Sequence, residues 1–401
     1  MDLHSRNPQG SEAIQSSLFT DDVIGGKRTY EMIEHDYMLS GDAPANTEQR
    51  KFVTNALYSP EKGMREVAVF CERITSNLLH DRSRKLRHSF WVDAVDDIAN
   101  LSHSTIIAEL FHIPLKTHTR PDKIGFTARE FYNINALLFA YVFRDIDTAQ
   151  SFGLRSETQQ STAAFTKVAI HVCQLVHDEH FRELKELLGL QEHDAMPDYG
   201  QRLIQRLFHG AKSVDEVASV VVATAAAAVA TQAQAFSQML DLYLSDQYNK
   251  HWPAIQELAR SKDSTAFTNL KRYAMEGLRL ATPSSGTLRV AVDDVVIKDG
   301  SRTVNIKKGD QVFTNFEQAC VDKDEFLDPH NIKLDRPDSS YIHLGYAEGV
   351  WQLKNLRRAP GWQGFMKYKN VNGALKMYLK EDFSDWWPYP TTMKIMFDDF
   401  E

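Results

Sequence analysis

The chain has 401 residues, of which 43% are hydrophobic and 25% are charged, proportions that exclude a disordered chain. Its 46 Lys and Arg residues against 54 Asp and Glu residues give a formal net charge of -8, so nucleic-acid binding is not expected. Only three cysteines occur, Cys71, Cys173 and Cys320. They are too few and too far apart for a disulfide framework, which indicates a reducing compartment.

The N-terminal residues lack a basic start followed by an apolar run, so the sequence predicts a cytoplasmic protein. The longest uncharged stretch, residues 217–240, is long enough to cross a membrane. It is rich in alanine and carries several amides and hydroxyls, which gain little from insertion into lipid. We therefore interpret it as a buried central helix and expect no transmembrane span.

Residues 59–282 carry a mostly helical pattern with few glycines and prolines. Thr127 and Glu130 predict a capping box before a long apolar run. Ser213 and Glu216 form the same capping-box pattern directly before the uncharged stretch.

After Pro283 the sequence pattern changes from helical to strand-like. Short β-branched runs, separated by Asp-Gly and Lys-Gly-Asp turns, predict hairpins over residues 287–291, 295–297, 303–306 and 311–314. Two further runs, 375–379 and 393–397, flank a proline-rich connection. The sequence thus predicts a mainly α fold with small antiparallel β regions near its C-terminal end.

The motif that carries most information is Glu276-Gly277-Leu278-Arg279, followed by Pro283 and Arg289. Positions three apart share a helix face, so Glu276 and Arg279 can pair. Pro283 should end the helix, and Arg289 should lie in the first strand, where a guanidinium can bind a carboxylate through two bonds. The alternative interpretation is a surface ion pair and an exposed strand arginine.

In this order the motif resembles the cytochrome P450 superfamily, in which the arginine contacts a heme propionate. Longer segments resemble the C-terminal domain of fungal fatty-acid dioxygenase fusions, the psi-producing oxygenases and linoleate diol synthases: YAMEGLRL at 273–280, LRRAPG at 356–361 and PTTMKI at 390–395. Residues 37–47 resemble the junction upstream of that domain. The resemblance implies a junction segment, 1–58, packing on a P450-like domain, 59–401, with a helical part, 59–282, and a mixed β and loop part, 283–401.

In that family an N-terminal peroxidase-like dioxygenase domain produces a fatty-acid hydroperoxide, which the C-terminal heme-thiolate domain rearranges to a diol. This chain is too short for both, so the resemblance implies the second domain, with Met1 an internal start or the product of an incomplete gene model. Heme is the implied cofactor, and a fatty acid or fatty-acid hydroperoxide the implied partner. No Gly-rich phosphate loop occurs, so neither NAD nor flavin is expected.

The first departure from the family lies at its iron ligand. The family continues from a stretch matching Tyr341 to Gly345 into a cysteine loop and a long helix, but here only ten residues separate Gly345 from Leu356. The axial cysteine, whose thiolate promotes O–O cleavage, is therefore missing, and no metal ligand is assigned. Cys320 lies before the matching loop and is not expected to replace it. His343, beside the deletion, is the candidate heme contact, with a structural or exposed histidine as the alternative.

The second departure lies in the central helix, where Ala230-Thr231-Gln232 stands in place of the family's Ala-Asn-Gln. The family amides lie above the heme, so Thr231, Gln232 and Gln234 are the catalytic candidates. Thr231, Gln234 and Gln238 share one helix face and can form a polar lining. The alternative is that these groups pack against neighbouring helices.

The leading hypothesis is a P450-like domain of oxylipin metabolism, descended from a hydroperoxide isomerase or diol synthase and catalytically impaired. Whether the chain is an enzyme stays open. One alternative is a non-catalytic fatty-acid-binding or structural module. Another is a gene model that lacks an exon, in which case the natural protein carries the cysteine loop.

Overall fold

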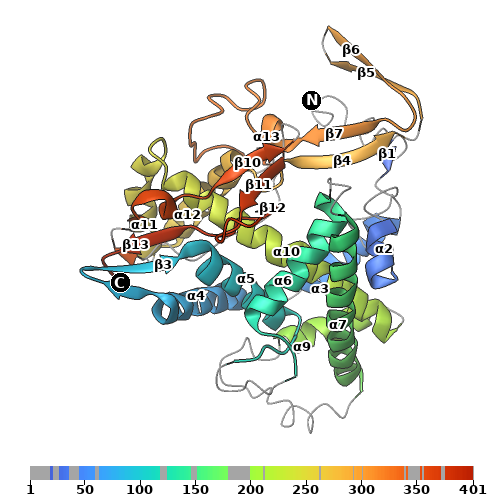
Figure 1. Ribbon diagram of the computed structural model, residues 1–401. Coiled ribbons are helices and arrows are strands. Elements are labelled where there is room, and N and C mark those ends of the chain that lie inside the picture. Colours follow the sequence, from blue (N-terminus) through green and yellow to red (C-terminus); the bar gives the residue numbers. More distant parts are fainter. Residues whose placement is uncertain are drawn as a thin grey trace.

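The computed structural model describes most of the chain, namely residues 19–20, 27–35, 45–58, 63–117, 124–145, 151–178, 199–210, 213–261, 263–291, 293–299, 301–337, 340–341, 353–354, 356–371 and 375–400. Helices form the body of the molecule, and small antiparallel sheets lie around it (Figure 1). The predicted mainly α architecture with small β regions is confirmed.

The helical body consists of several long helices and a few single turns. Its members are α2 (Lys27–Ile33), α3 (Ala45–Tyr58), α4 (Gly63–Arg82), η2 (Ala94–Ala99), α5 (Asn100–Leu110), α6 (Ala128–Phe139), η3 (Ala140–Arg144), α7 (Ser151–His177), α9 (Tyr199–Phe208), α10 (Val214–Tyr243), η4 (Asn249–His251), α11 (Trp252–Arg260), α12 (Ser264–Ala281), α13 (Phe316–Ala319) and η6 (Gly361–Gly364).

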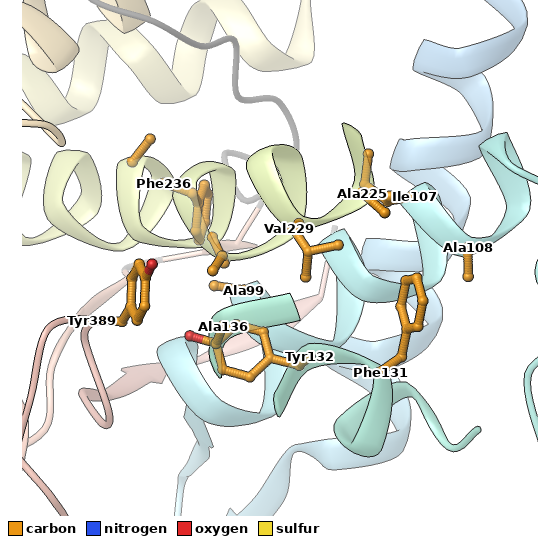
Figure 2. Packing of buried hydrophobic residues seen from close by; sticks show 14 of the residues in the cluster. Ala99, Ile107, Ala108, Phe131, Tyr132, Ala136, Ala225, Val229, Phe236 and Tyr389 are labelled. Carbon is orange, nitrogen blue, oxygen red and sulfur yellow. The ribbon is translucent and has the colours of Figure 1, made fainter. Parts of the chain in front are cut away.

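Helix α10 is the centre of the body, and α5, α6, α7 and α12 pack around it. Its start is fixed by Ser213, whose side-chain oxygen accepts a hydrogen bond of 3.2 Å from the backbone N–H of Glu216. Alanine and valine dominate its buried surface, so neighbouring helices can approach closely. Figure 2 shows residues of α5 and α6, such as Tyr132, packed against Val229 of α10. The predicted buried central helix is confirmed.

By length and composition alone, α10 would also be able to cross a membrane. Its most apolar 18-residue window is 67% buried inside the protein. A core helix of a large fold shows the same combination, so this is weak support for a membrane span.

Helix α6 begins at the predicted capping box. The Thr127 hydroxyl accepts from the Glu130 N–H at 3.1 Å, and the Thr127 N–H donates to the Glu130 carboxylate at 2.7 Å. A further cap that the sequence pattern did not indicate is the buried Asp93, whose carboxylate accepts from the N–H groups of Val95 and Met393. Asp93 thereby ties the start of η2 to the C-terminal part of the chain.

The strands are short. They are β1 (Phe19–Thr20), β2 (Arg84–Leu86), β3 (Ser89–Asp93), β4 (Gly286–Ala291), β5 (Val295–Asp299), β6 (Arg302–Ile306), β7 (Gln311–Asn315), β8 (Leu353–Lys354), β9 (Arg357–Arg358), β10 (Tyr368–Val371), β11 (Leu375–Leu379), β12 (Trp386–Trp387), β13 (Lys394–Phe397) and β14 (Asp399–Phe400).

Within the described residues the strands pair in five antiparallel sheets, with the orders β1-β4-β7, β2-β3-β13-β9, β10-β11-β12, β5-β6 and β8-β14. The hairpin predicted at Asp299-Gly300 is confirmed, because β5 pairs with β6. The hairpin predicted around Gly309 is wrong, because β7 pairs with β4. The N–H of Gly309 donates to the carbonyl of Ala291 at 2.8 Å, so this turn continues the β4–β7 ladder and directs the chain away from β6.

Strands β11 and β13 flank the proline-rich connection as predicted, but they belong to different sheets. Strand β13 pairs with β3, which comes about three hundred residues earlier, with Ile395 opposite Val92. Helices α2 and α3, inside the segment 1–58, pack on α7 and α9 respectively. The domain boundary at residue 58 stays a prediction.

One buried histidine makes the stability of this fold sensitive to pH. The Nδ1 atom of His103 in α5 lies 2.8 Å from the carbonyl oxygen of Ala99, and its ring packs against Phe236. Burial lowers the pKa of His103, outweighing the hydrogen bond to Ala99, so folding favours the neutral ring. The unfolded chain takes up a proton at about pH 6.5, so stability falls as the pH drops below that value.

We expect His103→Gln to reduce the loss of stability between about pH 7 and pH 5, because this change removes the buried titrating ring. The urea midpoint measured across this range reports the slope. His177→Gln, which changes an exposed histidine, is the control and should leave the slope as it is. Equal slopes in wild type and His103→Gln would show that His103 is not responsible.

Candidate functional site

Glu276 and Arg279 of α12 form a buried ion pair. Both oxygens of Glu276 receive hydrogen bonds of 2.9 Å from Arg279, one helical turn further along α12. Both side chains are fully buried. The predicted pairing is confirmed, and the alternative of a surface ion pair is wrong, because the loop after α13 covers the pair.

A second arginine, which the sequence analysis missed, completes the cluster. Arg336 places its Nε atom 3.1 Å from Glu276 Oε1. The Tyr341 hydroxyl and the Lys333 N–H each donate to the same carboxylate at 3.0 Å. The loop that carries Lys333, Arg336 and Tyr341 is thereby fixed to α12.

Arg279 uses its remaining N–H groups on backbone carbonyls. It donates to Cys320 at 2.8 Å, to Pro329 at 2.6 Å and to Asn331 at 3.3 Å. The ring of Phe326 lies 4.9 Å from the Arg279 guanidinium carbon. Nearly every polar atom of the pair therefore has a partner, as a buried ion pair requires.

Burial alone would raise the pKa of Glu276. The hydrogen bonds from Arg279 and Lys333 and the charges of Arg279 and Arg336 outweigh this effect, so the pKa lies below its ordinary value. Glu276 is therefore ionised at neutral pH, and the cluster carries one negative and two positive charges.

Helix α12 ends at Ala281, two residues before Pro283, so the predicted end of the helix at this proline is confirmed. Thr282 takes a left-handed conformation with φ of 38°, and its hydroxyl donates to the carbonyl of Arg279 at 2.6 Å. The carbonyl of Pro283 then accepts from two distant side chains, Gln234 of α10 at 2.8 Å and Arg144 of η3 at 3.3 Å. Pro283 is thus the point where α12, α10 and η3 meet.

The predicted polar face of α10 is present, but most of its groups are already engaged. Thr231 donates back to the carbonyl of Ala227 in its own helix. Gln234 donates to Pro283, and Gln238 donates to the hydroxyl of Tyr378 in β11. The amide oxygens of Gln234 and Gln238 are buried and accept no hydrogen bond. Gln232 is partly exposed on the same helix.

Of the two predicted heme contacts, Arg289 and His343, only the backbone of Arg289 is described. The backbone of Arg289 lies in β4 opposite Val312, as the prediction of a strand arginine required, while its side chain is outside the described part of the structure. His343 lies outside the described residues. Both roles stay predictions.

A small apolar hollow lies beside α10, on the helix face that carries Thr231, Gln234 and Gln238 and on the N-terminal side of Thr231. Its lining consists of Thr29, Ile33, Leu138, Phe139, Val142, Phe143, Ala223, Ala226 and Ala227, from α2, α6, η3 and α10. Ala223, Ala227 and Thr231 follow one another at intervals of four residues, so the hollow continues the face that carries the glutamines. Neither the hollow nor Arg144 was predicted from sequence, because neither carries a local motif.

A long helix buried in a helical body, followed by a helix with a buried Glu-x-x-Arg pair that a second arginine completes, defines a P450-type fold. The sequence profile described as cytochrome P450 matches residues 15–346, and the chain belongs to this family. The crystal structure of CYP109E1 from Bacillus megaterium shows the same fold, with a TM-score of 0.61 at 15% identity, covering 98% of this chain and 92% of that one.

Among named relatives, the chain is 36% identical to psi-producing oxygenase A of Aspergillus fumigatus over 383 residues, which cover 90% of this chain and 35% of the relative. It is 34% identical to a bifunctional dioxygenase-epoxy alcohol synthase of Pyricularia oryzae, covering 90% of this chain and 33% of the relative. It is 27% identical to the 7,8-linoleate diol synthase of the same fungus, covering 90% and 40%. The chain thus spans little more than a third of the length of these relatives.

The P450 fold generally holds a heme through a cysteine thiolate. All three cysteines of this chain are described, and each belongs to the packing of the fold. Cys71 packs beside Phe70 in α4, and Cys173 is fully buried in α7, where burial raises the pKa of its thiol to about 12. Burial likewise raises the pKa of Cys320, although a hydrogen bond with Thr282 opposes the effect. Because ligation requires an accessible thiolate, the buried sulfurs of Cys173 and Cys320 do not fit an axial iron ligand. Cys71 is half-buried and packs on α4 against Phe70.

We expect Glu276→Gln to destabilise the protein by about 3–5 kcal/mol, because it leaves two buried guanidinium groups without their counter-charge. Urea unfolding of the full chain measures the loss. Glu66→Gln is the matched control: it removes an acid from the exposed pair with Arg202 and should leave the midpoint nearly unchanged. A loss for Glu276→Gln no larger than that of the control would contradict the assigned role.

Proposed function

We propose that this chain is a P450-fold domain of fatty-acid oxygenation metabolism that binds a long-chain fatty acid or its hydroperoxide without heme-thiolate turnover. The substrate class is supported by the names of its relatives, which include a linoleate diol synthase. The match covers only the P450 part of these relatives, so the dioxygenase activity in their names is not assigned to this chain.

The observation that carries the proposal is the placement of the three cysteines. Each lies inside a packed element, and the pKa values of the Cys173 and Cys320 thiols are raised by burial. Freeing Cys173 or Cys320 would open the core and cost several kcal/mol, since buried side chains of this kind are close-packed. This burial supports the proposal that the protein retains the fold of the family without an iron-ligating sulfur.

The ligand class is supported by the α10 face. Phe139, Val142 and Phe143 form an apolar wall beside the alanines of α10. Further along the same face, the unpaired amide oxygens of Gln234 and Gln238 can accept a hydrogen bond from a hydroxyl or hydroperoxide group. An apolar wall followed by polar acceptors matches a fatty acid that carries an oxygenated carbon.

We expect the purified full chain, supplied with hemin, to lack the red-shifted carbon monoxide difference band of thiolate-ligated ferrous heme. Offered hydroperoxy-linoleate, it should form no diol above the level of free hemin, as judged by chromatography of the products. CYP109E1 reconstituted in the same way is the positive control for the spectrum. A thiolate-type band, or diol formation that depends on the protein, would refute the loss of turnover.

A further inference from the structure

Three aromatic side chains are exposed together beside the sheet β10-β11-β12. Trp362 of η6 is 49% exposed. Phe365, which follows η6, and Phe383, in the connection between β11 and β12, are 55% and 53% exposed. All three line one small depression with Leu379 of β11. Single exposed rings are common on proteins, but rings gathered at one place mark an interaction surface.

Lysines lie over these rings. The Nζ atom of Lys367 is 4.4 Å from the centre of the Trp362 ring and 4.9 Å from that of the Phe383 ring. The Nζ atom of Lys369 is 4.4 Å from the centre of the Trp386 ring. Neither lysine forms an ion pair with a carboxylate in the described part of the chain. The rings therefore hold two positive charges at the surface that are free to meet an anion.

The sheet turns this side outward because its other face packs on the body. Tyr378 of β11 is buried in the core. Side chains alternate along a strand, so its neighbours Met377 and Leu379 point to the opposite face. Lys369 is paired with Met377, and Trp386 is paired with Leu379, so both lie on this outer face.

The same side of the molecule continues onto the sheet β2-β3-β13-β9. Lys394 of β13 donates to Glu381 at 2.6 Å, and Glu381 lines the depression between the rings. Met396, two residues after Lys394 and so on the same face, lies opposite Trp91 of β3. Trp91 lies opposite Arg84 of β2, which is exposed. Arg84 therefore adds a further cation to this side.

The charge that remains on this side is positive. Glu381 and Asp385 are each paired with a lysine, and Asp382 accepts hydrogen bonds from Ser384. Residues 82–87, which include β2, contain Arg and Lys but no acid. The chain as a whole carries a formal charge of -8, so the sign of this side is opposite to that of the whole molecule.

We propose that this side of the protein docks on the surface of an anionic lipid bilayer. The basic–aromatic face that makes the contact consists of Arg84, Trp362, Phe365, Lys367, Lys369 and Phe383. Aromatic rings favour the boundary between headgroups and acyl chains, and lysine and arginine side chains are attracted to anionic headgroups. A second copy docked through the same face would bring the excess positive charge of both copies together, which disfavours self-association.

The test is co-sedimentation of the full chain with vesicles of phosphatidylcholine alone and with vesicles that also contain phosphatidylserine. Wild type should bind the mixed vesicles more tightly, and added salt should release it, because salt screens the attraction to the headgroups. Lys367→Gln combined with Lys369→Gln should weaken binding to the mixed vesicles about tenfold or more, since each cation near an anionic surface contributes about fivefold. Trp362→Ser combined with Phe383→Ser should also weaken it about tenfold, because two rings no longer enter the boundary.

The matched controls make the same changes on exposed residues of α3 and α7. Lys51→Gln combined with Lys167→Gln, and Phe152→Ser at a side chain that is 82% exposed, should bind like wild type. Losses in these controls as large as those in the test variants would overturn the proposal.

Failure of wild type to bind the mixed vesicles would overturn it as well. Dimerisation of wild type that the aromatic variant abolishes, without vesicle binding, would assign the face to a second copy and overturn the bilayer. If the aromatic variant does not fold, the lysine variant decides, and unchanged vesicle binding in that variant overturns the proposal. The vesicles contain no free fatty acid, so each of these results is separate from the proposed function.

Discussion

The carboxylate of Glu276, shared by Arg279 and Arg336 in the interior, is the interaction on which the rest of this structure depends. Charges are costly to bury, and they are tolerated only when every polar atom finds a partner in good geometry. The Glu276–Arg279 pair comes close to this condition by recruiting groups of the loop from Cys320 to Tyr341, although the Nε atom of Arg336 makes an ion pair and no hydrogen bond. The same geometry fixes the end of α12 and therefore the position of the Pro283 carbonyl.

The Pro283 carbonyl in turn connects the ion cluster to the face of α10. Gln234 and Arg144 both donate to it, so one backbone oxygen positions an amide of the central helix and a cation of η3. The alanines of α10 permit close packing, but they provide no polar partners for the glutamines. This is why the amide oxygens of Gln234 and Gln238 remain unpaired, and each is an acceptor that a ligand or water can complete.

The P450 fold of this chain is held together by contacts between protein groups. The ion cluster, the central helix and the small sheets do not depend on an iron ligand, because each is held by its own contacts. The sulfurs of Cys71, Cys173 and Cys320 fill space in the packing of helices and loop, and Cys320 also offers its carbonyl to Arg279. A fold of this kind can therefore persist while its function is decided by the few side chains around the α10 face.

The sequence by itself determined the features that are local or periodic. Capping residues such as Thr127 and Ser213 indicated where helices begin, and an uncharged stretch indicated the central helix. A spacing of three residues indicated the Glu276–Arg279 pair. All three features depend on residues within one or two helical turns of one another. Only the tertiary structure decided that Arg336 joins that pair from sixty residues away, that β7 pairs with β4, and that Arg144 lies beside Tyr389. These contacts join segments far apart in the chain, and their energy comes from burial and partner geometry that no local pattern encodes.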